Sequence, residues 1–286
     1  MRSDRRRLLS GIAALALATA LPAQAEEGLE EVRQKGRLRV AVYNDFAPYS
    51  FDGRGIDVDL GHALAERLGV KAEIAWFNAD EDMNDDLRNM VWRGHYLGGK
   101  PGDVMLHVPF DRHLATRNPQ VRIVGPYHQE RLAIARVPDR VPEPVGAAEE
   151  ALGVFTREKI GVETASGPDA FLLGVLGGRL RENVVHFRGV PQAVEGLRGG
   201  KVAAVMAPRA ELESALGKDV ATFPVAPVQL PELRNTGSWP LALAVRSEAA
   251  TLAEALAQAM QSLHDDGTVA RIFARYGITH SVPKGS

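Results

Sequence analysis

Short apolar strands alternate with amphipathic helices along most of this 286-residue chain. The first strand is predicted at 37–43 (RLRVAVY), where apolar residues recur at every second position. A helix follows and ends at Gly69. Its apolar face is formed by Leu60, Ala63, Leu64 and Leu68. Further strands are predicted at 72–77 and 103–108. Such alternation is typical of α/β folds with mostly parallel sheets.

Two later segments are near-copies of each other, at 132–136 (LAIAR) and 241–246 (LALAVR). Both are predicted to be short buried strands. Between them we expect a separate series of strands and helices. The strands are predicted at 159–162, 184–187 and 202–206, and the helices at 168–180 and 191–197. Two apolar helical stripes at 252–263 and 269–276 close the chain. The length and this organisation predict two domains.

The first 25 residues are typical of an export signal. A basic start containing Arg5, Arg6 and Arg7 precedes an apolar run at 8–21, which is too short to span a bilayer. Small residues at 23–25 form a cleavage site. The arginines fit either the general secretory route or a twin-arginine signal. We therefore expect a periplasmic protein whose mature form begins at Glu26.

Composition excludes several classes of function. The formal net charge is −2, whereas nucleic-acid binding needs a basic face. The chain contains no cysteine, so disulfides, zinc–thiolate sites, thiol nucleophiles and a lipidated N-terminal cysteine are ruled out. Nothing matches a nucleophile elbow, a P-loop or a dinucleotide fingerprint. We expect no cofactor, no catalytic residue and no enzymatic activity.

Three motifs, in this order and spacing, carry a resemblance to a known family. They are 45–51 (DFAPYSF), 55–60 (GIDVDL) and 265–268 (DDGT) with the helix after it. Together they resemble the type II periplasmic solute-binding proteins related to polar amino acid receptors (family 3), one branch of which accompanies quinoprotein dehydrogenases. The resemblance implies an α/β "Venus flytrap" of two lobes joined by two hinge strands. It implies a signal peptide at 1–25, lobe 1 at 26–135 and 240–286, and lobe 2 at 136–239.

The resemblance also implies ligand-binding residues. Arg112 matches the arginine that holds a ligand carboxylate with both donors of its guanidinium, and the alternative is a surface arginine paired with Asp111. Phe46 matches the aromatic residue that packs on the ligand, and Tyr49 follows the proline of the same turn. His107 stands where the family has a hydroxyl.

Lobe 2 supplies the remaining candidates. Ser166 matches a hydroxyl that contacts the ligand carboxylate, and Thr164 lies beside it. The alternative for Ser166 is an ordinary helix cap. The family usually places an aspartate for the ligand ammonium after the strand at 202–206. Here that position is Pro208, followed by Arg209 as a further candidate. An unpaired ammonium is costly to bury, so a carboxylate or another polar organic ligand is expected.

The segment 80–114 is longer and more aromatic than the family needs. Long loops are often functional, so it is expected to add a wall to the cleft or a docking surface. His95, His107, His113 and His128 lie in or near it, but their spacing matches no metal-binding motif. We therefore expect no metal site.

We predict a monomeric solute-binding protein that captures a small polar or carboxylate-bearing molecule for an ABC permease by closing its cleft. One alternative is an accessory protein of a periplasmic quinoprotein dehydrogenase or cytochrome. Another is an enzyme like cyclohexadienyl dehydratase, whose general acid would be Glu163, Asp169 or His107.

Overall fold

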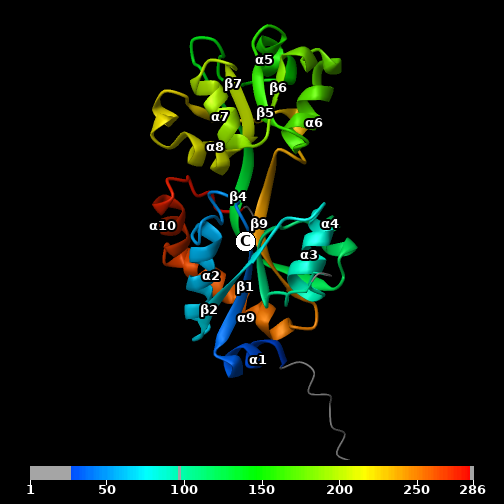
Figure 1. The fold of residues 1–286 in the computed structure, drawn as a ribbon, viewed down its shortest axis with the longest axis vertical. Helices are drawn as coiled ribbons and strands as arrows, with labels where there is room; N and C mark the ends of the chain where they lie inside the picture. Colours follow the sequence, from blue (N-terminus) through cyan, green and yellow to red (C-terminus); the bar gives the residue numbers. More distant parts are fainter. Residues whose placement is uncertain (1–26, 96–97, 284–286) are drawn as a thin grey trace, which may run out of the picture.

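The computed structural model describes residues 27–95 and 98–283. Within them, nine strands form one sheet in the order β2-β1-β3-β9-β4-β7-β5-β6, with β8 paired to β4. Figure 1 shows two lobes connected by the long strands β4 and β9. The predicted signal peptide falls outside the described residues. Within the described part of the chain, no helix is both long and apolar enough to cross a membrane.

Lobe 1 is a sheet covered by helices on both faces. Its strands are β1 (Arg37–Tyr43), β2 (Lys71–Phe77), β3 (Val104–Pro109), the first part of β4 (Val121–Arg136) and β9 (Ser238–Arg246). Its helices are α1 (Glu27–Lys35), α2 (Ile56–Arg67), α3 (Met83–Leu87), the π-helix η1 (Arg88–Trp92), α4 (Arg112–Arg117), α9 (Ala250–Asp265) and α10 (Thr268–Arg275). Residues of α2, α9 and α10 bury one apolar face, and α3 and η1 bury the other.

Lobe 2 repeats this layered arrangement on a smaller sheet. Its strands are β5 (Ile160–Glu163), β6 (Val184–Phe187), β7 (Ala204–Pro208) and β8 (Val225–Pro227). Its α-helices are α5 (Ala148–Leu152), α6 (Gly167–Gly174), α7 (Val190–Arg198) and α8 (Arg209–Leu216). Short 3-10 turns lie at Gly153–Thr156, Val175–Gly178, Arg181–Asn183, Gly217–Ala221 and Pro231–Leu233. Helices α5 and α6 pack on one face, and α7 and α8 on the other.

Strand β4 takes part in both lobes. Up to Arg131 it pairs with β9, and from Leu132 it pairs with β7 and β8. The predicted strand at 132–136 is therefore the second half of a 16-residue strand. The lobe boundaries proposed from the sequence stay a prediction, but the change of pairing partner falls close to them.

The strand directions make the carboxyl ends of the two sheets face each other. Strand β4 runs from lobe 1 into lobe 2, and β1 and β3 run in the same direction because both β3 and β4 are antiparallel to β9. In lobe 2, β7 is antiparallel to β4 and parallel to β5. The ends of β1 and β3 therefore point towards lobe 2, and those of β5 and β7 towards lobe 1. Ligands of open α/β sheets bind at such ends.

Two predicted segments differ in the structure. The helix expected at 168–180 ends at Gly174, because Leu176, Gly177 and Gly178 adopt left-handed backbone angles that no right-handed helix can include. The long segment at 80–114 is not an irregular loop. It contains α3 and η1, whose Leu87, Met90 and Val91 are buried against the lobe 1 sheet.

Candidate functional site

The turn after β1 brings aromatic residues to the edge of lobe 1 that faces lobe 2. It is closed by reciprocal backbone hydrogen bonds between Phe46 and Ser50, of 2.6 and 2.7 Å. Gly55 ends the turn with φ 137°, and a Cβ added there would lie 2.2 Å from the carbonyl oxygen of Tyr49. Only glycine fits this close approach, so the motif at 45–60 has a steric cause.

Three of the predicted ligand residues meet at this edge. The ring of His107 lies 4.7 Å from that of Phe46 and 4.1 Å from that of Tyr49, measured between centroids. Tyr49 is completely buried, and its hydroxyl donates to Glu130 Oε2 at 2.7 Å. Phe46 is half-buried and stacks on Tyr49. Tyr49 therefore supports the cluster from behind, while Phe46 and His107 form its outer side.

Burial sets the protonation of the groups behind this cluster. It raises the pKa values of Tyr49 and Tyr127 well above the usual range, and the nearby carboxylates of Glu130 and Asp57 raise them further. Both phenols therefore stay neutral and serve as hydrogen-bond donors. Burial also raises the pKa of Glu130, although the bond from Tyr49 opposes that shift.

On the lobe 2 side, a pocket of about 490 Å³ lies between helices α6 and α8 and the two connecting strands. Leu132 and Trp239 line it from β4 and β9, and Phe171 adds a second ring from α6. Three carboxylates, of Glu163, Glu211 and Glu232, also face it. Within the described part of the chain, no hydrogen bond or ion pair engages the side chains of these three residues. The pocket is thus built from aromatic walls and hydrogen-bond acceptors.

Two of these carboxyl groups retain protons more readily than usual. Burial raises the pKa of Glu163 above its ordinary value. Burial, with smaller contributions from the charges of Glu163 and Glu130, raises the pKa of Glu211 to about 8. A carboxyl group with such a pKa is neutral at pH 7 until a cation or a proton acceptor approaches it. The sequence-based view that the cleft lacks a carboxylate near Pro208 is therefore wrong, since Glu211 lies in the first turn of the next helix and lines the same pocket.

The other predicted ligand residues have partners of their own. Ser166 also lines the pocket, but its hydroxyl caps α6 by accepting from Asp169 N and donating to Glu163 O at 2.7 Å. Thr164 donates its hydroxyl to Phe187 O at 2.9 Å. The ligand contacts of both residues stay predictions. Gly167, the first residue of α6, also lines the pocket.

Two arginines lie outside both groups. Arg112 begins the short helix α4, which Asp111 caps, and its side chain is exposed beside Phe110. Arg209 donates to Glu213 Oε1 at 2.7 Å. Glu213 also accepts from the backbone N–H and the hydroxyl of Thr279, at 2.7 and 3.0 Å. This carboxylate thus ties helix α8 of lobe 2 to the segment that follows α10 of lobe 1.

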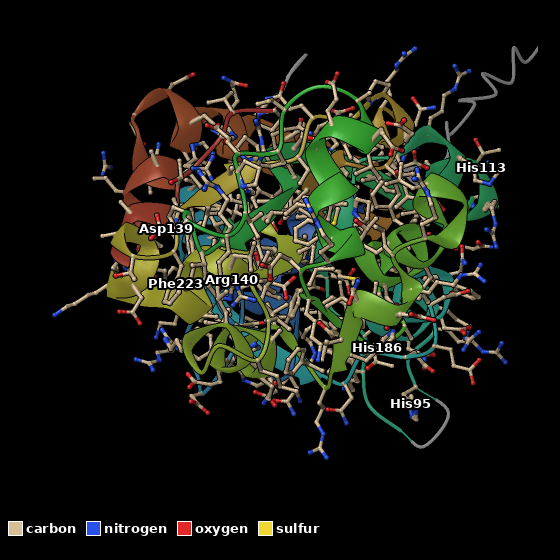
Figure 2. The ribbon with its side chains drawn as sticks, turned by 90° about the horizontal axis from the view of Figure 1, so that it is seen from above. His95, His113, Asp139, Arg140, His186 and Phe223 are labelled. Carbon is tan, nitrogen blue, oxygen red and sulfur yellow. The ribbon has the colours of Figure 1, made fainter. Side chains whose placement is uncertain are left out.

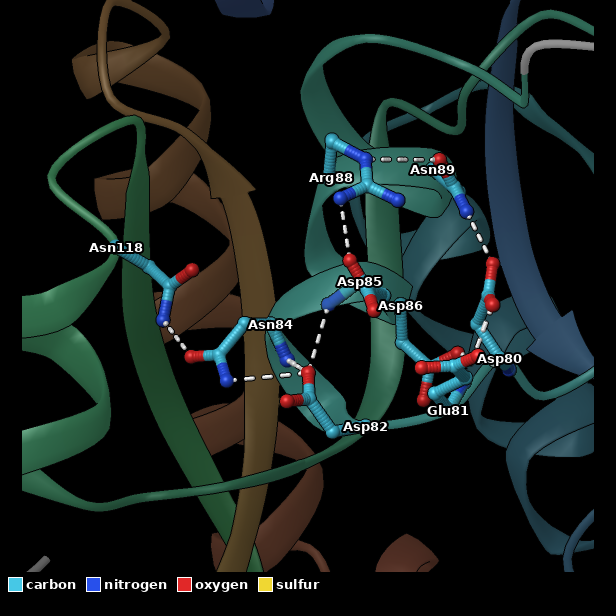
Figure 3. Close-up of polar contacts among 9 residues, drawn as sticks. All are labelled: Asp80, Glu81, Asp82, Asn84, Asp85, Asp86, Arg88, Asn89 and Asn118. Atoms are coloured by element: carbon cyan, nitrogen blue, oxygen red, sulfur yellow. Dashed lines mark hydrogen bonds and ion pairs between the residues drawn. The ribbon is translucent and has the colours of Figure 1, made fainter.

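The acidic run at 80–86 forms a capped turn (Figure 3). Asp82 accepts from the backbone N–H groups of Asn84 and Asp85, at 2.7 and 3.0 Å. Asp86 is buried and accepts from the hydroxyl of Tyr43 at 2.6 Å. Asn89 donates to Asp80 at 2.5 Å. The carboxylates therefore attach α3 to the end of β1 and cap its first turn.

The histidines considered as metal ligands are dispersed. His95 and His113 lie far apart at the rim of the molecule in Figure 2. His107 lies at the end of β3, and His128 is buried in β4, where burial lowers its pKa to about 3. In the part of the chain that the structure describes, no three histidine, aspartate or glutamate side chains are arranged to hold a metal ion.

Reasoning from the sequence missed Asp57, Tyr127, Glu211 and Trp239 as site residues. Asp57 falls within the motif at 55–60, and in the structure it is completely buried and bonded to Tyr127. The spacing from Pro208 to Glu211 could have identified Glu211, because three residues make nearly one helical turn and place the two side chains on the same side of a helix. No signal pointed to Trp239, whose place depends on the path of β9 between the lobes.

No protein-family model matches the chain. The chain is 35% identical over 103 aligned residues to cyclohexadienyl dehydratase of Pseudomonas aeruginosa, and the match covers 33% of this chain and 38% of that enzyme. Among solved structures, an ancestral cationic amino acid solute-binding protein superposes with a TM-score of 0.66 at 20% identity, over 87% of this chain and 99% of that one. An amino acid ABC transporter substrate-binding protein from Streptococcus pneumoniae, bound to L-arginine, superposes with a TM-score of 0.58 at 23% identity. That superposition covers 89% of this chain and 99% of the other.

These likenesses define the fold. The chain has the two-lobed, type II fold of the periplasmic solute-binding proteins, and the fold predicted from its sequence is confirmed. The match to the dehydratase covers little more than a third of that enzyme's length. What the relatives bind or catalyse is a property of those proteins.

Proposed function

We propose that this protein is a periplasmic solute-binding protein that captures a small polar or carboxylate-bearing organic molecule. One observation carries the proposal. The carboxyl ends of both sheets face each other across two connecting strands, and each edge presents side chains suited to ligand contact. Lobe 1 offers Phe46 and His107, and lobe 2 offers the pocket of Glu163, Ser166 and Glu211. A molecule held by both edges favours the closed form, because only that form contacts it from two sides.

Thermal unfolding of the mature chain against carboxylates, amines, amino acids and sugars tests the proposal. A ligand that binds only the folded state raises the melting temperature by mass action. X-ray scattering on the same samples should show a smaller radius of gyration when the lobes close. If no solute changes either quantity, solute capture is refuted.

The role of Arg112 is tested in the same screen. Arg112→Ala should abolish the stabilisation by a carboxylate and leave that by an uncharged solute. Arg117→Ala is the matched control, because Arg117 is exposed in the last turn of the same helix. Equal losses in both variants would mean that Arg112 acts only through the net charge.

We further propose an inner-membrane ABC permease as the partner, which reads the closed form of a monomer. The alternative partner is a periplasmic quinoprotein dehydrogenase or its cytochrome. Crosslinking of the full chain in its native periplasm, with and without a solute found by the thermal screen, separates them. A permease crosslink that increases with the solute supports transport. A dehydrogenase crosslink that ignores the solute supports the accessory role.

A dehydratase is the second candidate function, and Glu163 favours it. Its carboxyl group faces the pocket with a raised pKa, which suits a general acid that protonates the leaving hydroxyl of a cyclohexadienyl acid. The hydroxyl then departs as water, while the ring carboxylate departs as CO₂ and leaves its bonding electron pair to complete the aromatic ring. Asp169 is less suited, because it is buried and bonded to His186 and to the backbone N–H of Ala165, each at 2.9 Å. Incubation with a hydroxylated cyclohexadienyl acid should show water loss that Glu163→Gln abolishes. Tight binding without turnover would exclude the enzyme.

A further inference from the structure

The backbone of His107 is held in an uncommon conformation. It has φ 64°, in the left-handed region, although it is not a glycine. The pairing of β3 with β9 shifts register between Met105 and Val108, so His107 lies in a β-bulge. Bulges redirect side chains near functional sites. A left-handed residue of this kind is strained and persists where the surrounding structure enforces it.

A buried pair, Asp57 and Tyr127, enforces it here. The hydroxyl of Tyr127 donates to Asp57 Oδ1 at 2.8 Å and accepts from the backbone N–H of His107 at 3.1 Å. The other oxygen of Asp57, Oδ2, lies 3.5 Å from His107 Nδ1. Both of these atoms are buried without a hydrogen bond to any described residue. The pair therefore holds the backbone of His107 on one side and faces its ring on the other.

This geometry selects one tautomer of the ring. A hydrogen on Nδ1 is attracted by the carboxylate oxygen of Asp57 that lies 3.5 Å away. A lone pair on Nδ1 would instead face a carboxylate oxygen, which is unfavourable in a buried site. With the hydrogen on Nδ1, the free lone pair of the ring is on Nε2.

The ring's remaining surroundings leave Nε2 on the accessible side. Tyr43, Phe46 and Tyr49 enclose the ring, with centroid distances of 6.3, 4.7 and 4.1 Å. The side chain is 14% exposed. Because Nδ1 is buried, the exposed part is the opposite edge of the ring, at the end of β3 that faces lobe 2.

We infer that His107 is a hydrogen-bond acceptor for the captured solute, and that Asp57 and Tyr127 are positioning residues that hold its Nδ1–H tautomer. The inference rests on the proposed solute binding. A carboxylate behind an imidazole strengthens the acceptor on its far side. The group that fits Nε2 is an O–H or N–H donor. Since the carboxyl groups of Glu163 and Glu211 also line the pocket across the cleft, the solute is a polar molecule that carries hydroxyl or amino donors.

Nitrogen NMR of the full-length mature protein tests the tautomer without any ligand. The ¹⁵N shifts of the His107 ring should show Nδ1–H in the native protein and a shift towards Nε2–H in Asp57→Asn. Tyr127→Phe keeps the carboxylate and should keep Nδ1–H, so it remains informative if Asp57→Asn fails to fold. Asp59→Asn is the matched control, since Asp59 lies in the same helical turn and bonds to Arg275 and Tyr276 instead. A native ring with Nε2–H, or with both hydrogens, would overturn the inference.

Acetate, glycolate and glycine then test the acceptor, because they share a carboxylate and differ in the donor. Glycolate and glycine should bind about two- to tenfold more tightly than acetate, as one hydrogen bond allows. They should also move the Nε2 resonance. His107→Asn should erase that preference, because asparagine tolerates the left-handed backbone but is too short to replace Nε2.

The outcome separates this inference from the proposed function. If other solutes close the lobes but the three probes bind native protein and His107→Asn alike, the acceptor role fails and solute capture stands. If the Nδ1–H tautomer is found but no solute closes the lobes, the proposed function fails, and the acceptor role fails with it.

Discussion

Replacing Glu211 with glutamine removes a titrating group from the lobe 2 pocket and keeps its shape. The folded protein holds the pKa of Glu211 at about 8, whereas its ordinary value is 4.5. Each pKa unit corresponds to about 1.4 kcal/mol, so the shift allows at most about 5 kcal/mol. Glu211 is only half-buried, and solvent screens part of that energy. We therefore expect an effect of about 2–3 kcal/mol on the free energy of unfolding.

The sign follows from which state holds the proton. Between pH 4.5 and 8 the folded protein keeps the proton on Glu211, and the unfolded chain releases it. Stability falls with rising pH wherever the folded state binds more protons. The contribution of Glu211 is therefore fully present below about pH 4.5 and is lost as the pH rises through about 8. The glutamine side chain does not titrate, so Glu211→Gln lacks this decline.

Urea unfolding at intervals from pH 5 to pH 9 measures the effect. The unfolding free energy of the native protein minus that of Glu211→Gln should fall by about 2–3 kcal/mol over this range. Glu232→Gln is the matched control, because Glu232 faces the same pocket but is exposed. Parallel curves for the native protein and Glu211→Gln would show that the folded state does not raise the pKa of Glu211. The claim that Glu211 holds a proton in the folded protein at pH 7 would then be refuted.

Three further substitutions have defined outcomes. Gly55→Ala places a Cβ 2.2 Å from a backbone oxygen and should lower the free energy of unfolding in urea by more than about 3 kcal/mol. Gly53→Ala is the control, because its Cβ meets no atom within 4 Å, and it should lower the same free energy by about 1–2 kcal/mol. Tyr49→Phe removes the 2.7 Å bond to buried Glu130 and should cost about 1–3 kcal/mol by the same assay, and no loss would mean that water replaces the phenol. Glu213→Gln weakens the contact with Arg209 and Thr279 and should therefore lower the melting temperature. The control is Glu195→Gln, which removes an exposed ion pair with Arg198 on α7 and should leave the melting temperature unchanged.

The strand pattern made most of the fold predictable. Alternating apolar residues at 37–43 and the near-copies at 132–136 and 241–246 correspond to β1, β4 and β9. These signals are local, and burial of one strand face is enough to produce them. The early end of α6 was not predictable in the same way. Apolar residues continue past Gly174, but Leu176, Gly177 and Gly178 adopt left-handed angles that end the regular helix.

The candidate site was predictable only in part, because its contacts are non-local. Phe46, Tyr49 and His107 were singled out from one lobe, and the structure brings them together. Their supporting partners come from other elements. Asp57 belongs to α2 and Tyr127 to β4, and neither position differs from ordinary core or cap residues in the sequence. Only the three-dimensional arrangement shows that these residues share one network.

The replacement of an expected aspartate by Pro208 shows why position alone misjudges a pocket. A proline at the end of β7 cannot hold a cation, yet it starts α8 without losing a needed N–H group. The first turn of that helix then carries Glu211 into the pocket that Glu163 and Ser166 already line. The acceptor lies nearly one turn further along the chain, on a longer side chain and in a setting that raises its pKa. A solute that brings a cation to Glu211 must therefore displace a proton at pH 7, and its binding should strengthen as the pH rises towards 8. Calorimetric titration in buffers of different ionisation enthalpy measures that proton release directly, and titrations that do not depend on the buffer would place the solute's cation elsewhere.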